Sequence, residues 1–81
     1  MTREEFITWA IGHKWIADKF GHFQKEILMT TTPPEIKKYR IKLSSISARH
    51  EVKSSVGWVR LRSGYFKNLS INEKGQLIGM K

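Results

Sequence analysis

Two arginines that could bind an anion, Arg60 and Arg62, lie between the aromatic residues Trp58 and Phe66. All four are at even-numbered positions. In a β-strand, residues two apart share a face, so one side of this segment would present guanidinium groups and flat rings. Such a face suits a polyanion that carries bases, because guanidinium groups bind phosphate and aromatic rings stack on bases. The alternative interpretation is that Trp58 and Phe66 cover a second small core while the arginines are solvated.

The preceding segment, residues 38–53, adds basic residues that should pair with this strand. Antiparallel pairing sets such side chains about 5 Å apart across the strands, where like charges repel unless an anion lies between them. We therefore predict a basic and aromatic sheet surface that binds nucleic acid. The predicted residues are Arg40, Lys42, Arg49, Lys53, Trp58, Arg60, Arg62, Tyr65, Phe66 and Lys67.

The net charge supports an anionic partner. The 81 residues carry a formal charge of +8, and residues 42–81 hold eight basic residues against Glu51 and Glu73. A field of this sign favours nucleic acid, an anionic membrane surface or an acidic protein.

Residues for metal, cofactor or covalent chemistry are scarce. The chain has no cysteine, and the three histidines, His13, His22 and His50, are not at the spacing of a local metal site. No glycine-rich phosphate loop is present, because the six glycines are isolated. We predict no metal, no cofactor and no enzymatic activity.

One resemblance points to a different function. The helix-first order and the Gly21-His22 step resemble bacterial mRNA-cleaving toxins with a double-stranded-RNA-binding-like fold, over the first thirty residues. The resemblance implies that His22 acts as a catalytic base, with Lys25 as the local second group. The glycine-serine-histidine motif of that family is absent, however, since Phe20 precedes Gly21, and residues 76–81 hold no counterpart of its closing helix. We favour a structural histidine.

Length and hydropathy indicate one small domain, residues 1–81, that does not enter a membrane. The N-terminus includes Glu4 and Glu5 where a secretory signal would be basic, and the aliphatic or aromatic runs reach only three residues, as in 27–29. The absence of cysteine favours a reducing compartment, so we expect a cytoplasmic protein.

The order of elements predicts an α+β fold. Thr2 and Glu5 form a capping box, so a helix should span residues 3–12 and close at Gly12 in the left-handed conformation, with an extension to Gly21 as the alternative. Four strands should follow: residues 20–27, then 38–53 after a proline loop at 30–35, then 57–71, then 77–80 after a tight turn at 72–75. We expect a β-bulge or a sharp bend near Ser44-Ser45 and a bend at Gly64. The result would be a curled antiparallel meander, α-β-β-β-β, that approaches a small barrel.

Two functions of different classes follow from this surface. The first is a non-enzymatic module that binds RNA or single-stranded DNA, since no helix has the basic face of a major-groove reader. The second is a small inhibitor or adaptor, of the kind that phages and mobile elements encode, whose basic face binds an acidic or nucleic-acid-processing protein. Open edge strands would also allow a homodimer.

Overall fold

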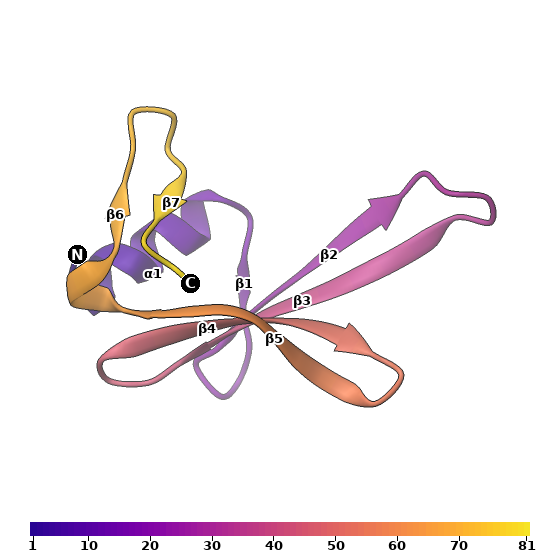
Figure 1. Ribbon diagram of the computed structural model, residues 1–81, viewed down its shortest axis with the longest axis horizontal. Helices are drawn as coiled ribbons and strands as arrows, with labels where there is room; N and C mark the ends of the chain where they lie inside the picture. Colours follow the sequence, from indigo (N-terminus) through magenta and orange to yellow (C-terminus); the bar gives the residue numbers. More distant parts are fainter.

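The computed structural model describes residues 1–81 as one α-helix, a five-stranded antiparallel sheet and a small separate hairpin (Figure 1). The strands of the large sheet follow chain order, β1-β2-β3-β4-β5, and β6 pairs only with β7. The α+β class and the antiparallel sheet are confirmed. The elements are α1 (Arg3–Gly12), β1 (Ile16–Ala17), β2 (Phe23–Met29), β3 (Glu35–Leu43), β4 (Ser47–Ser54), β5 (Gly57–Tyr65), a 3-10 helix (Phe66–Asn68), β6 (Ser70–Ile71) and β7 (Leu77–Ile78).

Helix α1 begins and ends where the sequence predicts. The Thr2 hydroxyl accepts from the Glu5 backbone N–H at 3.1 Å, and the Glu5 carboxylate accepts from the Thr2 N–H at 2.9 Å. The hydrogen bond from the Thr2 backbone, followed by that with its side chain, lowers the pKa of Glu5. The left-handed residue after the helix is Lys14, at φ 67°, so the expected role of Gly12 there was wrong.

The predicted single strand over residues 38–53 is wrong, because the chain reverses at residues 44–46 to form the β3–β4 hairpin. The Ser44 hydroxyl closes this turn by accepting from the Ser47 N–H at 2.9 Å and the Ile46 N–H at 3.3 Å. A serine side chain thus closes a full hairpin turn where we expected a β-bulge or a sharp bend within one strand. This split and the additional short strand β1 give the large sheet five strands, although the last of the four predicted strands does not join it.

The predicted strand over residues 57–71 also divides. β5 ends at Tyr65, and the following 3-10 helix turns the chain out of the sheet. A bulge does occur, but in β5: His50 pairs with Arg62 and Glu51 with Arg60, so Leu61 is an extra residue without a partner. Gly64 leaves space for the Leu69 side chain, whose Cδ2 would lie 3.0 Å from an added Cβ.

The C-terminal turn at residues 72–75 is confirmed, with Gly75 at φ 76°. Its hairpin packs on α1, where the Trp9 indole N–H donates to the Gly75 carbonyl at 2.8 Å. It forms its own sheet, so the expected fourth strand of the meander was wrong. Lys81 exchanges backbone hydrogen bonds with Ser63 of β5, but the large sheet does not close into a barrel.

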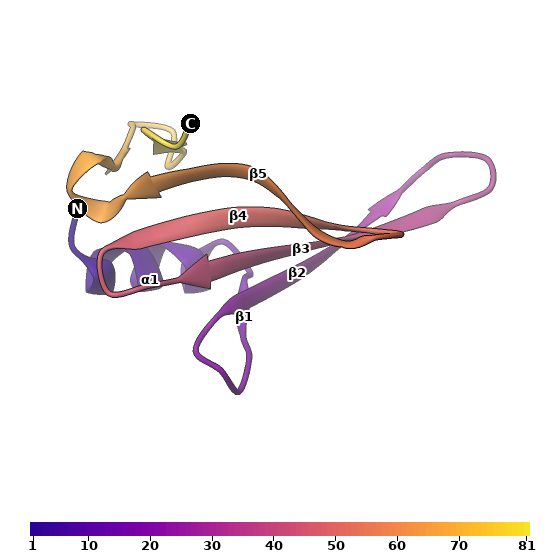
Figure 2. The ribbon, with the colours of Figure 1, turned by 60° about the horizontal axis from the view of Figure 1, so that its bottom comes forward.

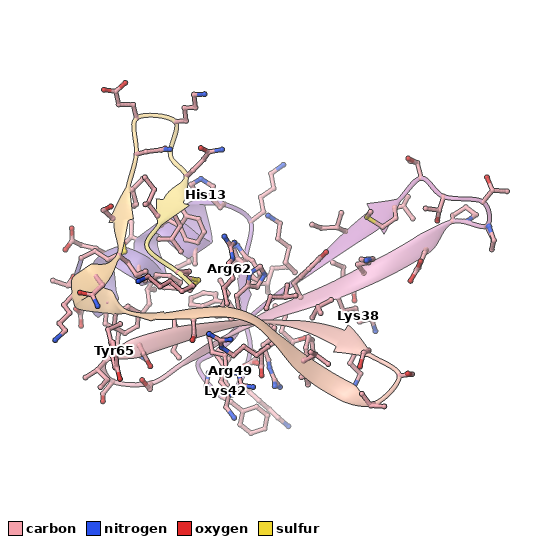
Figure 3. The ribbon with its side chains drawn as sticks, viewed as in Figure 1. His13, Lys38, Lys42, Arg49, Arg62 and Tyr65 are labelled. Atoms are coloured by element: carbon pink, nitrogen blue, oxygen red, sulfur yellow. The ribbon has the colours of Figure 1, made fainter.

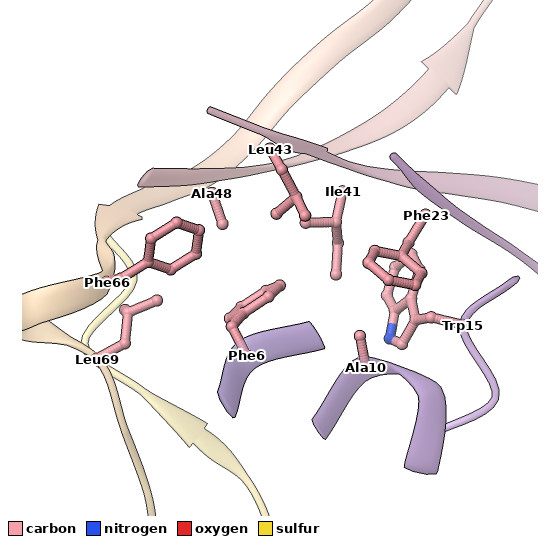
Figure 4. Close-up of a cluster of buried hydrophobic side chains, with 9 residues drawn as sticks. All are labelled: Phe6, Ala10, Trp15, Phe23, Ile41, Leu43, Ala48, Phe66 and Leu69. Carbon is pink, nitrogen blue, oxygen red and sulfur yellow. The ribbon is translucent and has the colours of Figure 1, made fainter. Parts of the chain in front are cut away.

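The core lies between α1 and one face of the sheet (Figure 4). Phe6 and Ala10 of α1 are fully buried, and residues of the neighbouring strands and of the chain after β5 surround them. Strand alternation over residues 57–71 also predicts a buried apolar face at the odd-numbered positions, and this prediction is wrong for all but one of them. Only Leu69 is buried, whereas Val59, Leu61, Tyr65 and Ile71 are exposed. The core residues are Phe6, Ala10, Trp15, Phe23, Ile41, Leu43, Ala48, Phe66 and Leu69.

Two hairpin arms extend past the part of the sheet that α1 covers. Figures 1 and 2 show the β2–β3 and β4–β5 ends diverging from each other, away from α1 and the C-terminal hairpin. The molecule is accordingly elongated, at 40 × 28 × 24 Å. No helix has the length and apolar character that crossing a membrane would need.

Candidate nucleic-acid interface

The sheet face opposite α1, here called the basic face, gathers cations from three adjacent strands. Directly paired residues share a face, and the register pairs Lys42 with Arg49, Arg40 with Glu51, and Glu51 with Arg60. Their chain neighbours Ile41 and Ala48 point the other way, into the core. The basic face comprises Lys38, Arg40, Lys42, Arg49, Lys53, Trp58, Arg60 and Tyr65, with the carboxylates of Glu26 and Glu51.

A buried carboxylate organises the centre of this face. Glu51 is only 4% exposed. Its Oε1 accepts a hydrogen bond from Arg40 Nε at 2.8 Å and forms an ion pair with Arg40 Nη2 at 2.7 Å, and its Oε2 forms an ion pair with Arg49 Nε at 3.1 Å. These charge-assisted bonds fix two guanidinium groups on the sheet surface.

The remaining cations of the basic face have little compensation. Lys42 and Lys53 form no salt bridge, and Lys42 lies directly opposite another cation, Arg49. Arg60 donates to the Ser63 hydroxyl at 3.1 Å and to the main-chain oxygen of Lys81 at 2.7 Å. Lys38 has only a long ion pair to Glu26, at 3.9 Å.

Aromatic rings lie near the two ends of the basic face, in different environments. Trp58 is half-buried, with the Arg40 guanidinium 4.4 Å from its ring centroid and the Lys53 ammonium at 5.6 Å. Tyr65 is exposed, with Lys67 at 5.9 Å from its ring. Tyr65 and Arg60 line one cavity of about 630 Å³. A ring and a guanidinium beside one hollow can contact a base and a phosphate together.

Eight of the ten predicted residues lie on the basic face or at its end, and two do not. Figure 3 shows Arg62 on the α1 side of β5 and Lys42, Arg49 and Tyr65 on the other. The bulge at Leu61 reverses the alternation, so that Arg62 leaves the basic face and Tyr65 joins it. Phe66 is 4% exposed and belongs to the core, so our inclusion of its ring as a stacking surface was wrong.

The prediction from the sequence missed three residues of this face, Lys38, Glu26 and Glu51. Lys38 shares the parity of Arg40 and Lys42, and this signal was available. Glu51 could not be identified as the central ion-pair acceptor, because its role depends on which strands flank β4.

The histidine singled out by the toxin resemblance is part of the framework. His22 Nδ1 accepts from the Leu43 backbone N–H at 3.0 Å. Lys25, the expected second group, donates to the His13 carbonyl at 3.0 Å. No group of three or more histidine or acidic side chains is arranged to hold a metal ion.

No protein-family model matches the chain, and comparisons with curated proteins and with solved structures find no match either.

Proposed function

We propose that this protein is a non-enzymatic nucleic-acid-binding module that uses the basic face to bind RNA or single-stranded DNA. The observation that carries the proposal is that Lys42 and Lys53, which form no salt bridge, lie on the same face as the exposed ring of Tyr65. Lys42 lies directly opposite Arg49, where two like charges are unfavourable without a counter-ion, and a phosphate chain supplies one.

Single strands fit this surface better than a duplex. The one α-helix turns Phe6 and Ala10 to the core and has Glu4 and Glu5 in its first turn, so it has no basic face for the major groove. The basic face is instead a sheet surface with an accessible ring, and exposed bases can stack on such a ring without regard to sequence.

The contacts suggest a division of roles on the basic face. Lys42, Lys53 and Arg60 would bind phosphates, and Tyr65 would stack on a base. Arg40 is held between Glu51 and Trp58, so Arg40 and Trp58 would support the surface more than contact the ligand.

The rival ligand is an acidic protein, which the same cations would attract. The proposal favours nucleic acid because Tyr65 adds a stacking surface that acidic side chains would not use. We keep the expected cytoplasmic setting as part of this proposal, since single-stranded RNA is present there and the chain has no cysteine.

Salt dependence tests the proposal. Fluorescence anisotropy with labelled RNA, single-stranded DNA and duplex DNA should give tightest binding to a single strand. The slope of log affinity against log salt should correspond to about four to six phosphate contacts. The double variant Lys42→Gln/Lys53→Gln should bind more weakly, with a slope smaller by about 1.4, because each single-strand contact contributes about 0.7.

The matched control removes two charges from the opposite side of the molecule. Arg62→Gln/Lys74→Gln has the same net charge as the test variant, and with oligonucleotides that lack a 5′-phosphate its slope should equal that of the parent. Equal effects of the two variants would show that only net charge matters and would overturn the assigned face. Tyr65→Ala should cost about 1 to 3 kcal/mol of single-strand affinity at unchanged slope. Polyglutamate that binds as tightly as RNA would favour the acidic-protein alternative.

A further inference from the structure

A second candidate site lies on the other side of the sheet. A cavity of about 490 Å³, here called the helix-side cavity, opens between the end of α1, the β6–β7 turn and strands β4 and β5. No acidic residue lines it. Its chemically active residues are Trp9, His13, Trp15, His50, Arg62 and Lys74.

The cations of this cavity have no partner within the protein. Neither the Arg62 guanidinium nor the Lys74 ammonium forms a salt bridge, and neither side chain donates a hydrogen bond. The buried His50 Nε2 also has no hydrogen-bond partner. Buried polar atoms are nearly always satisfied, so an orphaned one beside a cavity indicates an unfilled interaction. A wall of cations and donors without carboxylates selects an anion.

His13 gives the same cavity an aromatic surface. Its ring stacks on Trp9 at a centroid distance of 4.7 Å and an interplanar angle of 26°. Its Nδ1 lies 2.9 Å from the Trp9 carbonyl, which holds the imidazole in place. Because His13 is exposed, a further flat ring can stack on it.

We propose that the helix-side cavity binds the phosphate of a nucleotide through Arg62 and Lys74, with the base stacked on His13. A volume of about 490 Å³ is in the range of small-molecule sites. The ligand could be a free mononucleotide or the phosphorylated end of a strand, which share this chemistry. The inference goes beyond the proposed function and does not depend on it, since it concerns the opposite face of the sheet.

The surroundings of His50 agree with this assignment. Burial, and after it the positive charge of Arg62, lowers the pKa of His50. Trp15 packs edge-on at 5.6 Å and Tyr39 at 5.6 Å from the imidazole, so uncharged aromatic walls surround it. Because the imidazole there is neutral, Arg62 and Lys74 are the charged groups that would bind the anion.

Imidazole NMR of the unmodified chain tests the proposal. Titration with AMP should shift the side-chain signals of His13 and His50. His22 should not respond, because its Nδ1 is bonded to the Leu43 backbone away from the cavity. Ribose 5-phosphate and adenosine, which each lack one half of the ligand, should bind more weakly than AMP. An oligonucleotide that shifts His13 and His50 only when 5′-phosphorylated would identify the strand end as the preferred source.

The same two double variants test which residues bind AMP, with the roles of test and control exchanged. Arg62→Gln/Lys74→Gln should weaken AMP binding by about tenfold or more, since it removes both charge-assisted contacts. Lys42→Gln/Lys53→Gln should bind AMP as the parent does. An unshifted His22 signal in each variant confirms that the fold is intact. AMP that leaves His13 and His50 unchanged at millimolar concentration, or binds both variants equally, would overturn the proposal and leave the function of the basic face untouched.

Discussion

Glu51 is the one charged side chain that the fold buries, and it explains how a strongly cationic sheet can form. Its ion pairs with Arg40 and Arg49 offset the repulsion between the two guanidinium groups and fix their positions on the sheet. The Arg40 side chain then covers the ring of Trp58. Burying these ions has a desolvation cost, so the network is better explained by the position it gives the cations than by net stability.

His50 should make the protein less stable in mild acid. Its pKa is lowered by burial and by Arg62, so the unfolded chain binds a proton that the folded protein resists. Stability should therefore fall as the pH decreases below about 6.5, the ordinary value for histidine, and this loss should stop below the folded-state pKa. Urea unfolding between about pH 7.5 and pH 5 measures it. His50→Phe should flatten this part of the profile, while His13→Gln should not; an unchanged profile in His50→Phe would assign the acid sensitivity to other groups.

At the scale of elements, the sequence correctly predicted those helix ends, loops and turns that depend only on residues close together in the chain. The capping box of α1, the proline loop and the turn ending in Gly75 each depend on residues within one turn, and all three are found. The Ser44 turn was missed because it has no glycine, proline or asparagine. Its signal, the change in apolar parity, is also what a bulge would produce. The β5 bulge leaves no mark in the sequence, so the opposite placement of Arg60 and Arg62 could not be predicted.

Two leucine-to-alanine variants test which side chains in and after β5 are buried. Leu69→Ala should cost about 2 to 5 kcal/mol, because Leu69 is buried and packs against Gly64 and Gly79. Leu61→Ala, a matched deletion at the 44% exposed bulge, should cost less than about 1 kcal/mol. Chemical denaturation compares them. A larger loss for Leu61→Ala would restore the uninterrupted strand that the sequence pattern predicts.

At the scale of the whole molecule, the two sides of the sheet are covered differently. α1 and the C-terminal hairpin cover one side and enclose the helix-side cavity, while the other side remains open as the basic face (Figure 2). The net charge of +8 therefore acts at two separate surfaces. Beyond both, the β2–β3 arm presents Ile27, Leu28 and Ile36 to solvent.

We expect this arm to pair with a second copy of the chain, as the open edges predict. β1 covers only Phe23 and Gln24, so the outer edge of β2 is free from Lys25 to Met29. The His22 carbonyl accepts from the Asp18 N–H at this outer edge. Because every second residue of a strand directs its backbone N–H and C=O to the same edge, those of Glu26 and Leu28 point outward as well. Antiparallel pairing centred on Leu28 would place Leu28 on its own copy and Ile27 on Met29, without facing charges.

Association through this edge should have the opposite salt dependence from nucleic-acid binding. Two chains of charge +8 repel, so added salt should strengthen the dimer by screening, whereas it weakens phosphate contacts. Sedimentation equilibrium should show an average mass that rises with protein concentration, more steeply at high salt. Leu28→Lys places like charges at the dyad and should keep the chain monomeric, while Val56→Lys, at an even more exposed site on the other arm, should not. A parent chain that stays monomeric at high concentration and high salt would exclude this edge as a self-association site.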